Sequence, residues 1–329
     1  MRALASCVAF ALWAAACFAQ DAQSRAEAML DRARGVSDIR DKDATAFRLK
    51  LEFTFPGNDL EQKQGTYTEW WASKDKWRRE IVVGSDRRIE IGEPNTIFWS
   101  DVGEELPEQV RRLPGLVDPV PPRNRKMMFE SVISPVADDA NVECAVTVPS
   151  SSKQKGAFCF HKPSGVLIQK LEPYPVGRRI AAYRCDFAAF QIFGNHTYPR
   201  QMVCLVEGHK KIEVKVVELS LQGSLDANLF NPPADAVEIN LCTGKQEPPK
   251  TTSATFPSLP ESESLVSIGM EFVVDAQGNA RNVRITRSGG AAFDTPLVRA
   301  VQKWRFSPAK CDGRRISTKI AIEIPVTPP

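Results

Sequence analysis

Cysteines are the side chains whose types and spacing point most directly to chemistry. The chain has 329 residues and eight cysteines, and six of these lie beyond residue 20. None belongs to a Cys-x-x-Cys pair, the spacing typical of zinc ligands and thioredoxin-type redox sites. An even number of widely spaced cysteines in an exported chain indicates disulfides instead. The disulfide candidates are Cys144, Cys159, Cys185, Cys204, Cys242 and Cys311.

Six cysteines allow fifteen pairings, and the sequence alone does not choose among them. We expect each cysteine to pair with its neighbour along the chain: 144 with 159, 185 with 204, and 242 with 311. The third bridge would tie the end of one predicted domain to the next and limit their relative motion.

Other catalytic chemistry is weakly indicated. Cys159 and His161 are two residues apart and could share a strand face as a thiol–imidazole pair, but a disulfide at Cys159 is the favoured alternative. The sequence has no nucleophile elbow, P-loop, Gly-rich dinucleotide loop or His-Glu-x-x-His motif. We therefore expect no enzyme, no catalytic residue, no cofactor and no metal site.

The charge balance argues against nucleic acid as a partner. The chain has 43 Lys and Arg against 40 Asp and Glu. Nucleic-acid binding requires a concentrated basic face, which this balance does not suggest.

Residues 1–20 have the pattern of a secretory signal peptide. Arg2 precedes an apolar stretch interrupted only by Ser6, and small residues Cys17 and Ala19 stand at the −3 and −1 positions of a cleavage site. The alternatives are an uncleaved membrane anchor and lipid attachment at Cys17. The apolar stretch reaches roughly 25 Å as a helix, short of a hydrocarbon core of about 30 Å.

Residues 21–242 are expected to form a mostly antiparallel first domain. Residues 21–34 have the apolar spacing of a helix, and from Phe47 to Phe55 apolar residues alternate with polar ones, as in a half-buried strand. Short strands separated by tight turns then follow, which favours an antiparallel meander. The predicted class is α+β, with a half-barrel-like first domain.

A linker and a small second domain are expected to complete the chain. Residues 243–264 are rich in Pro, Ser and Thr and poor in large apolar residues, which is typical of a linker. Residues 265–329 have a β-β-α-β pattern, with a helix capped by Asp294 or Thr295. Its last strand alternates Ile316, Thr318, Ile320, Ile322 and Ile324.

Residues 265–326 resemble the C-terminal domain of the TonB family. The shared features are a strand ending in Val-Asp-x-x-Gly, a Ser-rich turn, an Asp at the helix start and a Trp-Arg-Phe-x-Pro-Ala run. The residues here that match these motifs are Asp275, Gly278, Asp294, Trp304, Arg305, Phe306 and Pro308.

The resemblance implies a periplasmic partner-binding module. In the family, the last strand accepts an extended peptide of an outer-membrane transporter by β-augmentation. It thereby implies a docking edge at residues 316–324, a protein or peptide partner in the envelope such as a TonB-dependent transporter, and a role like that of an energy transducer in transport. The alternative is that the first domain or a Cys242–Cys311 bridge covers this edge.

The first domain resembles, more weakly, the half-barrel lipoprotein carriers of the LolA and LolB type. The features are the N-terminal helix, a Trp-rich meander around Trp70, Trp71 and Trp77, and the Leu-Phe-Asn-Pro-Pro ending at 229–233. This resemblance implies an apolar groove for acyl chains and a second interpretation of function, as a carrier of lipid or lipoprotein. The structural alternative is that the tryptophans fill a core.

Overall fold

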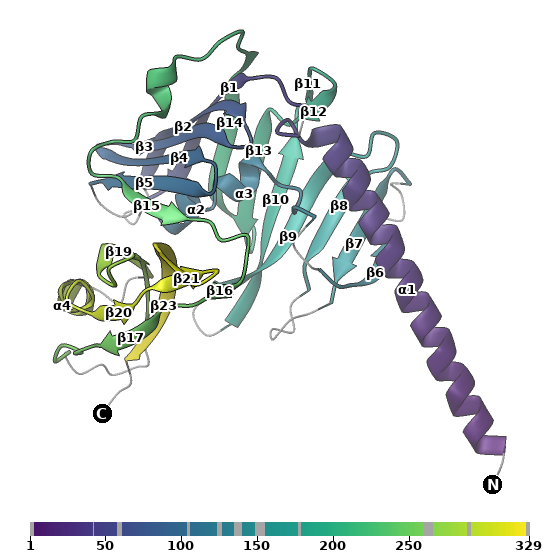
Figure 1. The fold of residues 1–329 in the computed structure, drawn as a ribbon. Coiled ribbons are helices and arrows are strands. Elements are labelled where there is room, and N and C mark those ends of the chain that lie inside the picture. Colours follow the sequence, from purple (N-terminus) through teal and green to yellow (C-terminus); the bar gives the residue numbers. More distant parts are fainter. Residues whose placement is uncertain are drawn as a thin grey trace. The chain divides into compact units, whose positions relative to one another are not determined.

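The computed structural model describes residues 3–41, 43–57, 61–103, 106–123, 127–134, 140–148, 155–176, 179–259, 266–287 and 291–326 (Figure 1). The chain divides into two compact units, each built from separated segments. Unit 1 contains residues 1–41, 51–64 and 112–219, and unit 2 contains residues 42–50, 65–111 and 220–329. This division groups the C-terminal segment with strands from residues 65–111. The domain boundaries expected from composition remain predictions.

Most strands belong to one large antiparallel sheet. Its hydrogen-bonded order is β15-β5-β4-β3-β2-β1-β14-β13-β10-β9-β8-β7-β6. An antiparallel sheet with few helices agrees with the expected α+β class. The early strands are β1 (Phe47–Pro56), β2 (Gln62–Ser73), β3 (Lys76–Val83), β4 (Asp86–Glu93) and β5 (Thr96–Val102).

Unit 1 places helix α1 (Ala3–Ser37) across strands β6 and β7 (Figure 1). Ala26, Leu30 and Ala33 are buried on one face of α1, at the helical spacing seen in the sequence. Gln23 fixes the position of the helix, because its side-chain oxygen accepts a hydrogen bond from the Phe129 N–H at 2.8 Å. Among the described residues, no helix combines the length and the apolar character needed to cross a membrane.

Two disulfides lie in unit 1, each joining residues that face one another on adjacent strands. Cys144 pairs with Cys159, and Cys185 with Cys204. Both are pairs that we expected from the sequence.

The other elements of this unit are α3 (Pro114–Val117), β6 (Phe129–Ile133), β7 (Val142–Thr147), β8 (Ala157–His161), β9 (Leu167–Val176), β10 (Arg179–Ala188), β11 (Gln191–Phe193), β12 (His196–Tyr198), β13 (Gln201–Val206) and most of β14 (His209–Leu221).

Unit 2 contains most of β2, strands β3–β5, and β15 (Val237–Asn240), which pairs with β5. One face of β4 buries Ile89 and Ile91 against Phe230 of the short 3-10 helix Ala227–Phe230. On the opposite face Gly92 faces Trp77 across β3 and β4. A Cβ at Gly92 would lie 2.1 Å from the Trp77 ring, so only glycine lets the indole lie there. Helix α2 (Glu108–Arg111) follows β5.

The C-terminal module, residues 266–326, lies in unit 2. Its three-stranded sheet has the order β19-β18-β23, so β18 is central and β23 is an edge. The elements are β18 (Val266–Val274), β19 (Ala280–Arg287), α4 (Ala291–Val301), β20 (Arg305–Ser307), β21 (Ala309–Cys311), β22 (Arg314–Ile316) and β23 (Thr318–Val326). Along the chain, β18 and β19 are followed by α4, the short strands β20–β22 and the last strand β23.

The expected linker is partly structured. Within residues 243–259 strand β16 (Gln246–Glu247) pairs with β21, and β17 (Lys250–Ser253) pairs with β20. Cys242, at the end of the predicted first domain, is bonded to Cys311, the third pair expected from the sequence. These residues therefore follow the surface of the C-terminal module and do not form a simple tether.

Candidate peptide-binding site at strand β23

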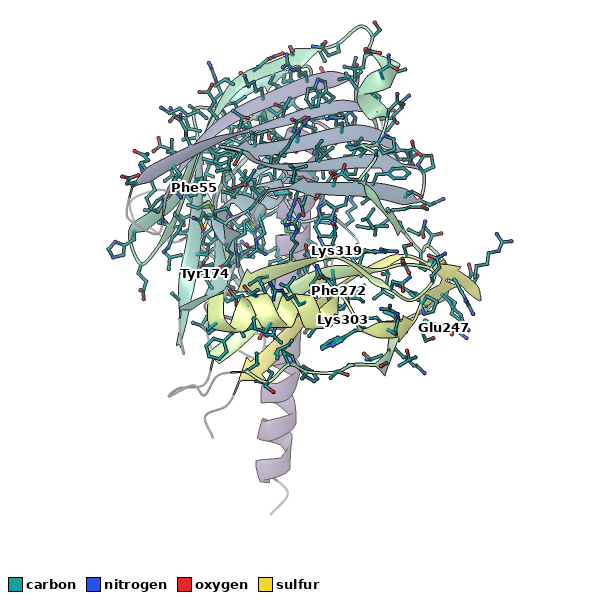
Figure 2. All side chains as sticks on the ribbon, turned by 90° about the vertical axis from the view of Figure 1, so that its left-hand side faces the viewer. Phe55, Tyr174, Glu247, Phe272, Lys303 and Lys319 are labelled. Atoms are coloured by element: carbon teal, nitrogen blue, oxygen red, sulfur yellow. A yellow bond between two sulfur atoms is a disulfide. The ribbon has the colours of Figure 1, made fainter. Side chains whose placement is uncertain are left out.

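Helix α4 and the sheet of the C-terminal module enclose its core. Figure 2 labels Phe272 within this core and Lys319 on the outside of the module. Phe272 is fully buried, as are Leu297 and Val301 of α4. The helix begins at Ala291, three residues before the predicted cap, so Asp294 lies in its first turn and Pro296 lies inside it. The predicted Ser-rich turn at 288–290 lies outside the described residues.

Asp275 and Gly278 build the turn between β18 and β19. The Asp275 carboxylate accepts hydrogen bonds from the backbone N–H groups of Gln277 at 3.0 Å and Asn279 at 2.8 Å. Arg281 donates to its second oxygen at 3.1 Å. Gly278 has a φ of +86°, a conformation that favours glycine. The Asp-x-x-Gly motif is therefore a structural feature that fixes the hairpin.

These hydrogen bonds change the acidity of Asp275. Burial acts to raise the pKa of this carboxyl, but hydrogen bonds from Asn279, Arg281 and Gln277 to its charged form outweigh burial and hold the pKa below its ordinary value of 3.8. The turn is consequently most stable with Asp275 ionised.

The Trp-Arg-Phe motif joins the end of α4 to the sheet. Trp304 is buried, its indole Nε1 donates to the carbonyl of Thr255 at 3.1 Å, and its ring meets Phe256 edge-on at 5.0 Å. Phe306 packs against Phe272, with ring centroids 5.6 Å apart. Arg305 is exposed and donates to the Trp304 carbonyl at 2.9 Å. Pro308, half-buried, separates β20 from β21. These contacts hold the end of α4 and the sheet together.

Only part of the predicted docking edge belongs to the edge strand. Ile316 lies in β22, opposite Ala309 of β21, because Asp312 and Gly313 form a turn with φ of +51° and +81° before it. In β23, Ile320 and Ile322 pack against the core and Ile324 is buried, while Lys319, Ala321 and Glu323 are exposed. The apolar side chains of this strand thus stabilise the module, and the docking role predicted for Thr318 and its neighbours stays a prediction.

The main chain of β23 presents a short outward-facing edge. Ser317 donates its N–H to Asn240 Oδ1 at 2.9 Å and accepts from the Asn240 N–H at 3.0 Å, so both its backbone groups point to Asn240. Residues of an antiparallel strand direct these groups alternately to the two sides. The groups of Lys319 and Ala321 accordingly point away from β18. Pro325 is an even number of residues from Ser317, so its backbone nitrogen also points away from β18. The missing N–H of proline therefore costs no hydrogen bond to β18.

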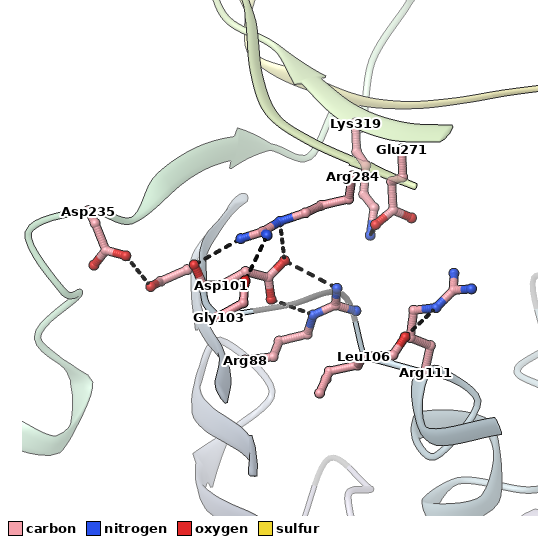
Figure 3. Close-up of polar contacts among 10 residues, drawn as sticks. Arg88, Asp101, Gly103, Leu106, Arg111, Asp235, Glu271, Arg284 and Lys319 are labelled. Atoms are coloured by element: carbon pink, nitrogen blue, oxygen red, sulfur yellow. Dashed lines mark hydrogen bonds and ion pairs between the residues drawn. The ribbon is translucent and has the colours of Figure 1, made fainter. Parts of the chain in front are cut away.

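Arginines of unit 2 hold the module beside strands β4 and β5 (Figure 3). Arg88 and Asp101 form a two-pronged pair, with Nε–Oδ1 at 2.7 Å and Nη2–Oδ2 at 3.2 Å, and both side chains are less than a tenth exposed. Arg284 of β19 donates to the carbonyls of Asp101 at 3.0 Å and Gly103 at 3.1 Å. Arg111 donates to the Thr286 carbonyl. This cluster fixes β19 against the end of β5.

Lys319 makes the corresponding contact from β23. Its ammonium lies 4.4 Å from the ring centroid of Trp99 on β5 and 2.9 Å from the carboxylate of Glu271 on β18. Such a contact combines an ion pair with cation–π attraction. The contact between Lys319 and Trp99 therefore holds the first residues of β23 beside β5.

A cleft of about 410 Å³ opens beside this end of β23. Ile97 and Trp99 of β5 face Ile239 and Val237 of β15 in register. The residues that line the cleft are Glu90, Ile97, Trp99, Ile239, Asn240, Leu241, Cys242, Gln246, Thr318 and Lys319. Sequence reasoning missed Asn240, Arg284 and the cleft, because each depends on contacts between residues far apart in the chain.

The thiol–imidazole pair considered for Cys159 and His161 is not formed. Cys159 is bonded to Cys144, and His161 Nδ1 lies 2.7 Å from the hydroxyl of Ser164. Within the described part of the chain, no group of three or more His, Cys, Asp or Glu side chains is placed to hold a metal ion.

Solved structures similar to this chain include three proteins with low sequence identity. A LolA superfamily protein from Nitrosomonas europaea is 10% identical, with a TM-score of 0.43 over 63% of this chain and 97% of that one. An outer-membrane lipoprotein-sorting protein domain from Vibrio parahaemolyticus is 11% identical, with a TM-score of 0.40 over the same shares. A DUF1329 family protein from Desulfovibrio piger is 9% identical, with a TM-score of 0.43, again over 63% and 97%.

Among curated proteins, no sequence matches this chain. The C-terminal segment, in contrast, matches a known family. Residues 267–326 match the family of the Gram-negative bacterial TonB protein C-terminal, which confirms the resemblance for this part of the chain.

Proposed function

We propose that this protein binds an extended peptide of an envelope partner along β23, in the periplasm, as a binding protein and not as an enzyme. The peptide would add a strand to the β19-β18-β23 sheet, with main-chain hydrogen bonds supplying affinity. The family match supports this mode and makes the periplasmic segments of TonB-dependent outer-membrane transporters the first partners to test. Such peptide binding is one requirement of a transducer-like role in transport.

The observation that carries the proposal is the outward-facing main chain of Lys319 and Ala321. Ser317 already pairs with Asn240 much as it would pair with a docked strand. Its N–H donates one hydrogen bond to Asn240, and its carbonyl accepts another from Asn240. Pro325 limits pairing at the other end, because it lacks an N–H. Between these residues β23 offers a short edge of the kind that β-augmentation uses.

Ala321→Pro tests this edge in the purified full chain. The proline removes an N–H that points away from β18, whereas proline at Ile320 would break the ladder with β18 and unfold the strand. Calorimetric titration with synthetic N-terminal peptides of transporters from the same organism should show binding that weakens about tenfold or more, since each net hydrogen bond contributes about 0.5–1.5 kcal/mol and the ring obstructs pairing.

Ala321→Ser is the matched control, because it keeps the N–H and should bind like the original protein. Equal binding by the Pro and Ser variants would exclude docking on β23. Failure of every peptide to bind the folded, unaltered chain would contradict the transporter-binding role.

A second candidate function, carriage of a lipid acyl chain, is supported by a cleft of about 500 Å³ in unit 1. Charged residues form part of its lining: Glu27, Asp31, Arg34 and Arg123. Its apolar lining residues are Leu30, Met127, Met128 and Phe129, and Met128 is 71% exposed. Such exposed apolar side chains often mark ligand or partner surfaces.

Fatty-acid binding followed by fluorescence would test the carrier role. Met128→Glu should abolish binding. Ile192→Glu, at an exposed apolar residue outside this cleft, should leave it unchanged. Equal affinity of both variants for the fatty acid would exclude the cleft.

A further inference from the structure

We infer that the cleft beside β23 receives a Lys or Arg side chain of the docked peptide, with Glu90 as its ionic partner. This inference rests on the proposed function, since it concerns the selectivity of the same edge. It begins from the position of the cleft, which is lined by Thr318 and Lys319 at the first residues of β23.

Asn240 determines where the peptide must leave the edge. Its backbone and side chain occupy both outward backbone groups of Ser317. A peptide paired with Lys319 therefore cannot continue along the strand, and its next residue must turn aside. Asn240 also lines the cleft, so this residue of the peptide is brought to the opening of the cleft.

The charges around the cleft favour a cation. Glu90 lies on β4 opposite Trp99 of β5 and is only partly buried. Within the described residues, its carboxylate has no hydrogen bond or ion pair. Lys319, the cation of the lining, is already paired with Glu271 at 2.9 Å. The lining thus has an uncompensated negative charge.

The cation nearest in register does not compensate Glu90. Arg79 faces Glu90 across β3 and β4, but its guanidinium contacts Glu69 at 3.2 Å and lies 4.4 Å from the Trp77 ring centroid. Glu69 is fully buried, so releasing Arg79 would leave a buried carboxylate without this partner. Arg79 therefore stays paired with Glu69, and an external cation is the better partner for Glu90.

The apolar walls suit the stem of a long basic side chain. Ile97 and Ile239 face one another in register, and both line the cleft with half-buried side chains. Leu241 is 48% exposed at the opening. Lys and Arg commonly lay their methylene stems along such surfaces while the charged head stays near water. The partner class is therefore an extended peptide with a basic residue just beyond its paired segment.

Paired peptides that differ at one residue provide the test. The probes share an alternating Val-Thr core and have either Lys or the uncharged isostere norleucine at one end, with one pair for each end. They are titrated into the full chain, Ala321→Pro, Glu90→Gln and Glu93→Gln. Glu93 is an exposed residue of β4 outside the cleft lining, and thus a matched control.

We expect the Lys peptide of one pair to bind about fivefold more tightly than its norleucine partner, the upper range for a partly exposed ion pair. Glu90→Gln should remove this preference without changing norleucine binding, and Glu93→Gln should keep it. The inference would be overturned, and the proposed function would stand, if Ala321→Pro weakens binding but the Lys peptides are not preferred. The same holds if they are preferred but Glu90→Gln leaves the preference unchanged. Binding unaffected by Ala321→Pro would overturn both.

Discussion

Gly278 and Phe306 are in direct backbone contact at the centre of the family motif. The Gly278 carbonyl accepts a hydrogen bond from the Phe306 N–H at 2.8 Å, and a Cβ at Gly278 would lie 2.0 Å from the Phe306 carbonyl oxygen. The turn after β18 and the strand after α4 therefore lock together. Two motif elements that are separate in the sequence thus form one structural unit.

Gly278→Ala should destabilise the module through both backbone strain and this contact. The positive φ alone costs about 1–3 kcal/mol for a residue with a side chain, and the clash adds to it. Gly313→Ala separates the two effects, because Gly313 also has a positive φ of +81° but a Cβ there would meet nothing within 4 Å. Urea unfolding should show the larger loss for Gly278→Ala, and equal losses would mean that the Phe306 contact is unimportant.

Replacing Asp101 should cost more stability than replacing Arg284. Asp101→Leu leaves the Arg88 guanidinium, only 8% exposed, without its carboxylate, and breaking a buried pair in this way costs about 3–5 kcal/mol. Arg284→Met removes hydrogen bonds to two carbonyls from a side chain that is 21% exposed, a loss of about 1–3 kcal/mol.

Chemical denaturation of Asp101→Leu and Arg284→Met tests this order of stability losses. A double variant that combines Arg88→Met with Asp101→Leu is measured beside them. The double variant should recover part of the stability lost in Asp101→Leu, since the buried charge of Arg88 is removed together with its carboxylate partner. A double variant as unstable as Asp101→Leu would show that packing, and not charge pairing, dominates at this position.

Acid should weaken the module through Asp275. Its folded pKa lies below the ordinary value of 3.8, so the unfolded chain binds a proton at a higher pH than the folded chain. The stabilisation is present above the unfolded pKa and is lost as pH falls through the lower, folded pKa. In Asp275→Asn, stability measured between pH 6 and 2 should fall less steeply over the acid end of this range. An unchanged slope would mean that Asp275 does not contribute to acid sensitivity.

The alternation of apolar and polar residues was sufficient to predict the strands that bury one face. Residues 47–55 alternate clearly, and Phe47, Leu49, Leu51, Phe53 and Phe55 are all buried. The motif turn at Asp275 and Gly278 was predictable for a similar reason, because a short-range turn depends on residues that are adjacent in the sequence. The expected cysteine pairs coincide with the three disulfides.

Contacts made by the backbone alone were not predictable. Strands β16 and β17 consist of exposed residues, so no apolar pattern marks them within the expected linker. The strand break at Ser317 depends on Asn240, which is 77 positions away. For the same reason the candidate site could be assigned to a strand from the sequence, but its limits and the cleft beside it required the structure.

The Cys242–Cys311 disulfide should contribute more to stability than Cys144–Cys159. Its partners are 69 positions apart, against 15 for the other bridge, and a longer loop restricts the unfolded chain more strongly. The loop-entropy relation gives about 4 kcal/mol for the first and about 3 kcal/mol for the second. Double Cys→Ser variants of each pair, unfolded in urea without reductant, should differ in that order.

The same variants separate a local from a long-range role of the bridge. Cys242 follows Asn240 closely and lines the cleft, while Cys311 pairs with Gln246 across β16 and β21. Loss of the Cys242–Cys311 bridge should therefore also loosen Asn240 from Ser317 and increase amide hydrogen exchange at Ser317, whereas loss of Cys144–Cys159 should not. If exchange at Ser317 stays slow in both variants, the hydrogen bonds of Asn240 hold the start of β23 without help from the disulfide.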